Sequence, residues 1–452
     1  MDKATYIAAT RFGLGASVGD PSSISDPRAW LLSQVQQREQ NLSDFSSLTS
    51  SQNNLKMIIE AKKEAKKSGV RGHGSPLDEF KKIYRKYFIA EMNAKIKHAI
   101  TTTTPFYEHL VDFWSNHFSV NHKKDKLVGI AGAYEREAIR PYITGKFVDM
   151  LMAVEKHPAM LYYLDNAQSI GPDSKAGKKM SRGLNENLAR EIMELHSLGV
   201  NGGYTQADVT TFASVITGWT VGGIRPDSAG TVGSFSFEER MHEAGAKTIM
   251  GKTYPDDGVG QGEAVLRDLA IHPATAKFIA FKLARHFIAD VPPASAVDAL
   301  AKEFQNTGGD LKAVYAVLLN LADSWTLAAP KVKSNYHLMV SAARLAGQDV
   351  FPTQWCLQGL NFLGDAPFTA PSPAGFSDVT SDMIGSEALL RRVEWARAAG
   401  ASRGLGRKSA KDLGELAIGA IMSKVTRDAI SNAPRPDLAF ALLLGSPEFQ
   451  RR

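Results

Sequence analysis

The chain has 452 residues, of which 44% are hydrophobic and 22% are charged. These proportions are ordinary for globular proteins and exclude a disordered chain, collagen and a coiled coil. Lys plus Arg number 53 against 47 for Asp plus Glu, and the resulting charge of +6 is too small to require a nucleic-acid partner.

Cysteine content and hydropathy narrow the possible class of protein further. Cys356 is the single cysteine, which excludes an intramolecular disulfide and a metal site built from several thiolates. No run of about 18 apolar residues occurs, so we expect no membrane span. Residues 1–5 do not begin a basic and then apolar leader, and by this criterion we expect a cytoplasmic protein.

Residues 1–104 are predicted to form an N-terminal helical arm. Pro27 is placed to start a first helix. Residues 56–98 are rich in Lys and Arg and are interrupted by glycines, which predicts two helices joined by a flexible basic loop. Because few aromatic residues accompany these cations, we interpret them as solvated helix faces rather than a nucleic-acid surface.

Residues 105–348 are predicted to form a central helical core. Pro105 can start a helix whose apolar face recurs as Phe106, Leu110, Phe113 and His117, which turns His117 inward. Similar spacing predicts further helices at residues 130–142, 147–154, 185–198, 206–217, 273–287, 295–305, 311–321 and 333–346.

A Gly-rich insertion interrupts this core at residues 221–262. Its short alternating pieces predict loops with one small β-hairpin. A Pro/Gly-rich stretch at residues 364–376 precedes further helices, so residues 349–452 are expected to form a C-terminal helical segment packed on the core. The predicted fold class is therefore all-α, with the three segments forming separate domains or one continuous domain.

Several cofactor and catalytic motifs are missing from the sequence. It contains no GxxxxGK[ST] phosphate loop, no GxGxxG, no HExxH and no GxSxG. We therefore expect no nucleotide cofactor and no serine-hydrolase site.

The segment at residues 185–199 concentrates ionisable and amide side chains. On a straight helix Asn187, Glu191 and Glu194 share one face, whereas His196 lies about 140° from Glu191. A purely structural alternative has Arg190 bridging Glu186 and Glu194 while His196 caps the last carbonyls.

Ordered motifs along nearly the whole chain point to one family. The run at 185–199 is followed by Gly202-Gly203-Tyr204-Thr205-Gln206 and Thr217-Gly218-Trp219, and other matching pieces are Phe113-Trp114-x-x-His117-Phe118, His157-Pro158-Ala159-Met160, Leu164-Asp165-Asn166, His242-x-x-Gly245-x-Lys247 and His272-Pro273-Ala274 through Leu283-Ala284-Arg285. In this the chain resembles the bacterial domain of unknown function 1800 (DUF1800) family. The resemblance implies a mostly helical protein, often exported to the periplasm and often encoded beside a second protein that carries a leader. The chain departs from the family pattern at Glu243, where the family usually has Asp.

Candidate functional residues come from these motifs. We assign catalytic roles to Glu191, Glu194 and His242, the last because it lies in a loop region on a helical scaffold. Metal ligation is assigned to His117, His196 and Asp165, and substrate binding to Asn187, Arg190, Trp219, Lys247 and Arg285. The alternatives are a core histidine for His117, an Asx turn for Asp165 and a core anchor for Trp219.

If these side chains converge, they offer acid–base chemistry or a site for a divalent metal such as Zn, Mn or Fe. We therefore expect a hydrolase or lyase that acts on an envelope-associated carbohydrate or another polar substrate. The alternative is a non-catalytic scaffold that binds the neighbour-encoded exported protein, with the same side chains forming a buried polar network.

Overall fold

The computed structural model describes residues 2–17, 24–36, 42–69, 76–124, 127–179, 183–223, 230–328, 331–402, 405 and 408–452. Within these ranges the chain is mainly helical, with two small antiparallel hairpins, which confirms the all-α prediction. None of the helices described is long and apolar enough to cross a membrane.

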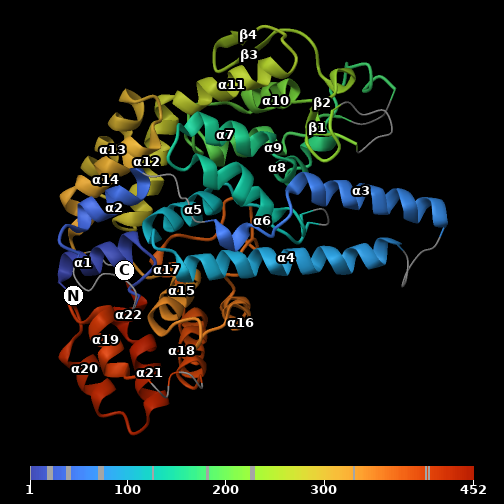
Figure 1. Cartoon of the computed structure of the whole chain (residues 1–452). Coiled ribbons are helices and arrows are strands. Elements are labelled where there is room, and N and C mark those ends of the chain that lie inside the picture. The colour runs from blue at the N-terminus through green and yellow to red at the C-terminus, as the bar shows by residue number, and fades with distance from the viewer. Residues whose placement is uncertain are drawn as a thin grey trace.

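The N-terminal region contains a pair of long helices. Its elements are α1 (Lys3–Ile7), the π-helical η1 (Ala8–Phe12), α2 (Pro27–Gln36), η2 (Ser43–Phe45), α3 (Ser51–Ser68) and α4 (Pro76–Thr101). Figure 1 shows α3 and α4 side by side, projecting from the body as an antiparallel arm. This confirms the two predicted helices, whereas the loop between them, at residues 70–75, lies outside the described residues.

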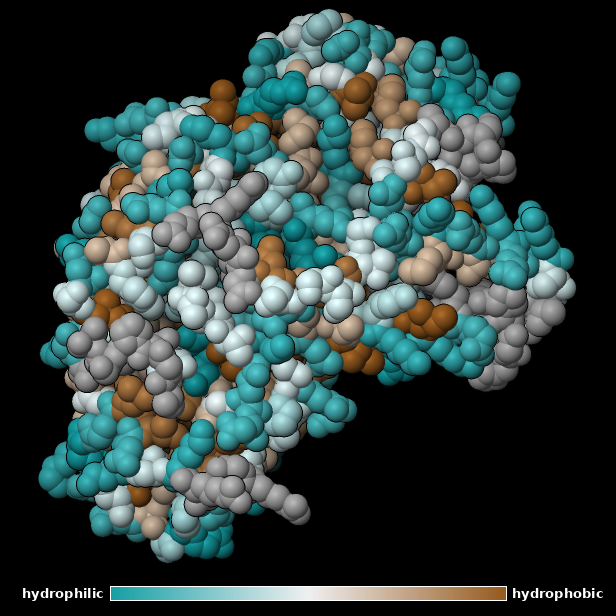
Figure 2. Space-filling view, viewed as in Figure 1, coloured by the Kyte–Doolittle hydropathy of each residue, from teal (hydrophilic) through white to brown (hydrophobic). Residues whose placement is uncertain are grey.

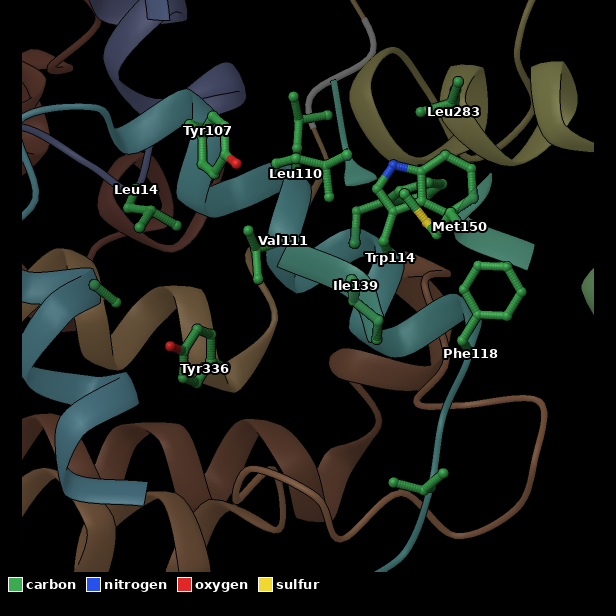
Figure 3. Close-up of a cluster of buried hydrophobic side chains, with 14 of the residues drawn as sticks. Leu14, Tyr107, Leu110, Val111, Trp114, Phe118, Ile139, Met150, Leu283 and Tyr336 are labelled. Carbon is green, nitrogen blue, oxygen red and sulfur yellow. The ribbon is translucent and has the colours of Figure 1, made fainter. Parts of the chain in front are cut away.

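Helix α5 (Pro105–His117) lies at the centre of the molecule. Its first residue is Pro105, whose fixed φ suits a helix start, and the predicted inward face is buried as expected. Trp114 Nε1 donates a 2.6 Å hydrogen bond to Tyr315 Oη, so even the polar atom of this side chain is satisfied in the core. Figure 3 shows α5 residues Leu110 and Trp114 in the same buried cluster as Met150 and Leu283.

In the described part of the chain, nine short elements lie between α5 and the Gly-rich insertion. They are α6 (Ala131–Tyr134), η3 (Glu135–Ile139), η4 (Arg140–Tyr142), α7 (Phe147–Lys156), α8 (Pro158–Tyr163), η5 (Asn166–Gln168), α9 (Asn187–Glu191), η6 (Ile192–His196) and α10 (Gln206–Val215). Two of the predicted helices differ from the structure in this region. Both η3 and η6 are π-helical, so the predicted helices at 130–142 and 185–198 change their winding part-way. The face assignment that assumed 100° per residue therefore does not hold at His196.

The Gly-rich insertion contains two hairpins rather than the one predicted. Strand β1 (Trp219–Val221) pairs with β2 (Phe235–Phe237), η7 spans Glu239–Met241, and β3 (Lys247–Ile249) pairs with β4 (Lys252–Tyr254). Met250 and Gly251 join β3 to β4 with φ angles of 48° and 78°, as a tight hairpin turn requires. Asp208 accepts a hydrogen bond of 2.7 Å from the Met250 backbone and ties this hairpin to α10.

The second half of the chain is helical again and packs onto the same core. Its elements are α11 (Val259–Ile271), α12 (Pro273–Phe287), α13 (Ala294–Asn306), α14 (Leu311–Asn320), η8 (Ala322–Trp325), α15 (Asn335–Ala346), α16 (Thr353–Leu363), α17 (Thr380–Met383), α18 (Ser386–Gly400), α19 (Ala410–Ile418), α20 (Lys424–Ser431), α21 (Pro436–Gly445) and α22 (Pro447–Gln450).

Buried apolar side chains form one cluster that extends from Tyr6 to Phe449. All three predicted segments contribute to it, although their division into domains remains a prediction. Figure 2 shows a largely hydrophilic face on which hydrophobic side chains form small groups. The large core holds the polar groups of α5, α12 and α15 in fixed positions, and these groups form the site described next.

Candidate functional site

A cavity of about 80 Å³ lies beside α5, enclosed by segments from both halves of the chain. We call it the central pocket. Its size admits several water molecules or part of a small ligand. Its ionisable lining residues are Lys95, Asp112, Glu135, His286, His337, Asp365, Asp378 and Arg452, and its aromatic ones are Phe113, Tyr134, Tyr336, Phe368 and Phe376.

Asp112 of α5 is held ionised on one wall of this pocket. His337 Nε2 lies 3.1 Å from Asp112 Oδ2, and Lys95 Nζ lies 3.6 Å from Asp112 Oδ1. Burial opposes ionisation, but the hydrogen bond from His337 and the charge of Lys95 outweigh it and lower the pKa of Asp112 to about 2. Lys95 also pairs with Glu135 at 2.6 Å, so the ammonium joins two carboxyl groups.

Arg452 occupies the neighbouring wall among three imidazoles. Its Nη1 atom lies 2.9 Å from His109 Nε2, 3.1 Å from His337 Nδ1 and 3.3 Å from His286 Nε2. His109 Nε2 also lies 2.7 Å from His286 Nε2. Burial lowers the pKa of all three histidines, that of His286 to about 4.

His286 forms an Asp–His pair within this network. Its Nδ1 atom lies 2.9 Å from Asp378 Oδ2, and Arg452 Nη2 lies 3.4 Å from Asp378 Oδ1. Burial opposes ionisation of Asp378, but His286, Lys331 and Arg452 together lower its pKa far below the ordinary value. Asp378 is therefore the fixed anion that orients His286 and Arg452.

Asp365 is the exception among the carboxyl groups of the pocket. Its side chain accepts a 2.9 Å hydrogen bond from the Tyr336 backbone at the start of α15, and the residue is 9% exposed. Among the described residues no Lys, Arg or His lies within ion-pair distance of it. Burial, with a contribution from Asp112, raises its pKa to about 6. The pocket thus combines an ionised carboxylate, Asp112, with a carboxyl that takes up and releases a proton near neutral pH.

The predicted residues of the 185–199 segment lie elsewhere, around a buried pair. His196 Nδ1 lies 2.8 Å from Glu155 Oε1, and both side chains are fully buried. The structural alternative, in which His196 caps the end of its helix, is therefore wrong, because the imidazole contacts Glu155 instead. His117 donates from Nε2 to the His196 carbonyl at 3.2 Å, so these two predicted metal ligands are neighbours.

Glu191 and Glu194 are half-buried, and the charges of His196 and Glu155 act on Glu191. Burial raises the pKa of Glu191, and Glu194 contributes to that rise. Arg190 donates to Glu186 at 2.9 Å and to Gln206 at 3.0 Å, while Asn187 is exposed at the start of α9. The structural alternative predicted that Arg190 bridges Glu186 and Glu194, and the contact with Glu186 is present.

His242 lies apart from this segment, in the Gly-rich insertion. Its Nδ1 atom donates to the Thr217 carbonyl at 3.2 Å, and its Nε2 atom lies 3.6 Å from Asp256. No hydrogen bond or ion pair joins His242 to Glu191 or Glu194 within the described part of the chain. Lys247 donates to the Ala244 and Gly245 carbonyls. The Glu243 carboxylate accepts from the Asp173 backbone at 2.9 Å.

The remaining predicted residues are dispersed. Trp219 is fully buried in β1 against Phe235, which corresponds to the core-anchor alternative. Asp165, at a positive φ of 60°, pairs with Lys124 at 2.6 Å at the surface. Arg285 lies over the Phe281 ring at 4.6 Å. No group of three or more His, Cys, Asp or Glu side chains is arranged to hold a metal ion within the described ranges, so His117, His196 and Asp165 form no such site there.

The sequence model of one family, described as protein of unknown function (DUF1800), matches residues 7–451. The chain belongs to the DUF1800 family. No curated protein and no solved structure matches it. The motifs by which this DUF1800 chain resembles its family supply only a few lining residues of the central pocket, because Asp365, Asp378 and Arg452 lie outside all of them.

Sequence reasoning therefore missed the ionisable residues that this DUF1800 protein gathers around the central pocket. One signal was available, since Asp112 directly precedes the Phe113-Trp114 motif and shares α5 with His109. Their partners His337 and Arg452 lie 225 and 343 positions away, and spacing along one helix does not show them.

Proposed function

We propose that this DUF1800 protein is an enzyme that uses general acid–base chemistry in the central pocket, for hydrolysis or elimination on a carbohydrate or another polar substrate. The observation that carries the proposal is a pair of carboxyl groups in one cavity, the half-buried Asp112 and the buried Asp365. Asp112 Oδ2 lies 3.1 Å from His337 Nε2 and Asp112 Oδ1 lies 3.6 Å from Lys95 Nζ, whereas no described Lys, Arg or His lies within ion-pair distance of Asp365, and the charge of Arg392 acts on it only from farther away. Two carboxyl groups in opposite environments are a recurring basis for an acid and an ionised partner.

Each carboxyl group then has a distinct role. Asp365, with a pKa of about 6, donates a proton to the leaving group. Asp112 stays ionised and stabilises positive charge that develops at the reacting carbon. Glu191, Glu194 and His242 remain candidates for a second catalytic site.

The experiment compares leaving groups. Purified protein is assayed on a panel of O-linked and N-linked glycosides. Each glycoside carries either a nitrophenyl leaving group or a leaving group that departs poorly unless it is protonated. The Asp365→Asn variant should lose about 10²–10⁴-fold in rate with poor leaving groups and much less with nitrophenyl, which departs without a proton. Asp112→Asn should lose rate with both.

Asp298→Asn is the matched control, because Asp298 is exposed on α13 away from the pocket lining. It should keep the full rate. Equal rates for Asp365→Asn and the unchanged protein on poor leaving groups would refute Asp365 as the acid. Turnover that depends on Glu194 and His242 but on neither Asp would move the chemistry to the second site.

A second candidate function, binding of the neighbour-encoded protein, is favoured by an apolar groove of about 430 Å³. The groove lies between α18, α20 and α21 and exposes Val393, Val425 and Leu442. Exposed apolar grooves of this kind accept an amphipathic helix. Replacing Val393 and Leu442 by Asp should weaken retention of the co-expressed neighbour protein while leaving catalysis unchanged.

A further inference from the structure

The central pocket contains more carboxyl groups than cations. Asp112, Glu135, Asp365 and Asp378 line it, against Lys95 and Arg452. Its two histidines are neutral at pH 7, because burial lowers the pKa of both. Further cations behind the wall neutralise two of these carboxyl groups, because Lys331 lies 3.4 Å from Asp378 and Arg140 lies 3.7 Å from Glu135. An anionic ligand group placed beside the remaining carboxylate, Asp365, would meet repulsion from it.

The carboxyl groups differ in how far they are already neutralised. Asp112 and Glu135 share the ammonium of Lys95, and Asp378 has Arg452 and Lys331 within 3.4 Å. Within the described residues Asp365 has backbone hydrogen bonds but no ion pair, although at 9% exposed it is more buried than Asp112 or Asp378, whose side chains are 24% and 22% exposed. An unpaired carboxylate in such a place is costly, so a cation beside Asp365 would be strongly stabilised.

The aromatic lining also suits a cation. The Lys95 ammonium lies 5.4 Å from the Tyr336 ring centre and 5.9 Å from that of Phe368, which shows that rings in this wall already stabilise positive charge. Phe113, Phe376 and Tyr134 extend the aromatic lining. A ligand ammonium offers three donors and no acceptor, which matches a wall rich in carboxylate acceptors.

We propose that the reaction in the central pocket breaks a carbon–nitrogen bond and releases a primary amine, which leaves as an ammonium ion paired with Asp365. This inference rests on the proposed function, because it names the leaving group of that same site. An alcohol leaving group would leave the Asp365 carboxylate unpaired after proton transfer, whereas an amine neutralises it.

The proton balance of the hydrolysis supports this pairing. The carbon–nitrogen bond breaks with its electron pair going to nitrogen, and a bond forms between that carbon and the oxygen of water. One proton comes from Asp365 and one from the attacking water, and both end on nitrogen. Substrate, water and neutral Asp365 thus give a hydroxyl product, an ammonium ion and an Asp365 carboxylate, with charge conserved.

Binding of matched probes tests the leaving group without requiring turnover. Cyclohexylammonium, cyclohexanol and cyclohexanecarboxylate have similar shapes and differ in one polar group. Calorimetric titration of the full chain at pH 7 should show at least tenfold tighter binding of the ammonium than of the alcohol, with the carboxylate weakest. Asp365→Asn should abolish the preference for the ammonium, while Asp298→Asn should keep it.

Three results would overturn the inference. The first is equal or tighter binding of the alcohol or the carboxylate, and the second is an ammonium preference that survives in a folded Asp365→Asn variant. The third is no binding of any probe. If Asp365→Asn fails to fold, Phe376→Leu replaces it and should reduce the preference for the ammonium several-fold. An unchanged preference in Phe376→Leu would refute the central pocket as the binding site. Turnover of O-linked sugars without an ammonium preference would overturn only the carbon–nitrogen inference. An ammonium preference without turnover on any substrate would overturn the enzyme proposal and retain the ligand class.

Discussion

The Nη1 atom of Arg452 lies 2.9 Å from Nε2 of His109, deep in the core. His109 donates from its other nitrogen to the Phe12 carbonyl, so a neutral ring must accept the hydrogen bond from Arg452. His337 accepts from the same guanidinium nitrogen at 3.1 Å. A cation therefore holds two neutral imidazoles in fixed tautomers beside the central pocket.

Removal of this cation should destabilise the protein. In Arg452→Ala the three imidazoles lose their shared donor and Asp378 loses a nearby cation, which should cost about 2–4 kcal/mol of unfolding free energy. Arg451→Ala is the control, because that side chain is exposed, and its effect should stay within about 0.5 kcal/mol. Urea denaturation of both variants measures the difference. Equal effects would mean that the buried network contributes nothing that the exposed residue does not.

Asp365→Asn should change stability in a pH-dependent way. The folded pKa of about 6 exceeds the ordinary 3.8, so wild-type stability falls as pH rises from about 4 to 6, where only the unfolded chain releases the proton. Above pH 6 the full penalty is present, at most about 3 kcal/mol for a shift of this size.

The Asn variant carries no such penalty and should be the more stable protein at pH 8, with the advantage gone at pH 4. Thermal unfolding at both pH values checks this, and Asp298→Asn serves again as the control. A constant difference between variant and wild type across the pH range would contradict a raised pKa at Asp365.

His196→Ala should be far more disruptive than Glu194→Gln, although the two residues are close in sequence. Loss of His196 leaves the Glu155 carboxyl buried without its partner, which should cost about 3–5 kcal/mol. Glu194 is half-buried and should tolerate Gln within about 1 kcal/mol. Circular dichroism melting curves compare the two. A well-folded Glu194→Gln variant then allows its turnover to be measured directly, which tests the predicted catalytic role.

Gly262→Ala should destabilise the junction between α11 and β1. A Cβ atom at this position would lie 2.5 Å from Cζ2 of the fully buried Trp219, so the indole ring would have to shift. We expect a loss of about 1–3 kcal/mol. Gly445→Ala, also in a helix, would meet only an ordinary contact at 3.8 Å and should not lower stability. Equal melting temperatures for the two variants would show that Trp219 can move without cost.

Sequence patterns predicted the helices well where one face is apolar. Pro105 gave the start of α5 correctly and the recurring apolar positions gave its buried face, because a helix start and a 3.6-residue period are local properties. The β3–β4 hairpin was missed because its strands have three residues each and are mostly exposed, so they show no apolar alternation. The π-helical turn at Ile192–His196 also leaves no trace in a pattern analysed at 100° per residue.

The candidate site was harder to predict, for a physical reason. Asp112, Asp365 and Arg452 each resemble ordinary surface charges in their local sequence, and only tertiary packing brings them to one cavity. The residues in the 185–199 motif were conspicuous because they lie close together in sequence. Closeness in sequence and convergence in space are independent here, since His196 pairs with Glu155, 41 positions away.

The contact between His109 and Arg452 joins residues 343 positions apart, which has a consequence for folding. Contacts of such long sequence separation form late, because closing a loop of that length has a high entropic cost. The central pocket is therefore absent from every partly folded form in which Arg452 has not docked. A ligand of the pocket will bind only the completed fold and will raise the melting temperature, the more so the further its concentration exceeds its Kd. Thermal shift can thus screen for such ligands before any reaction is known.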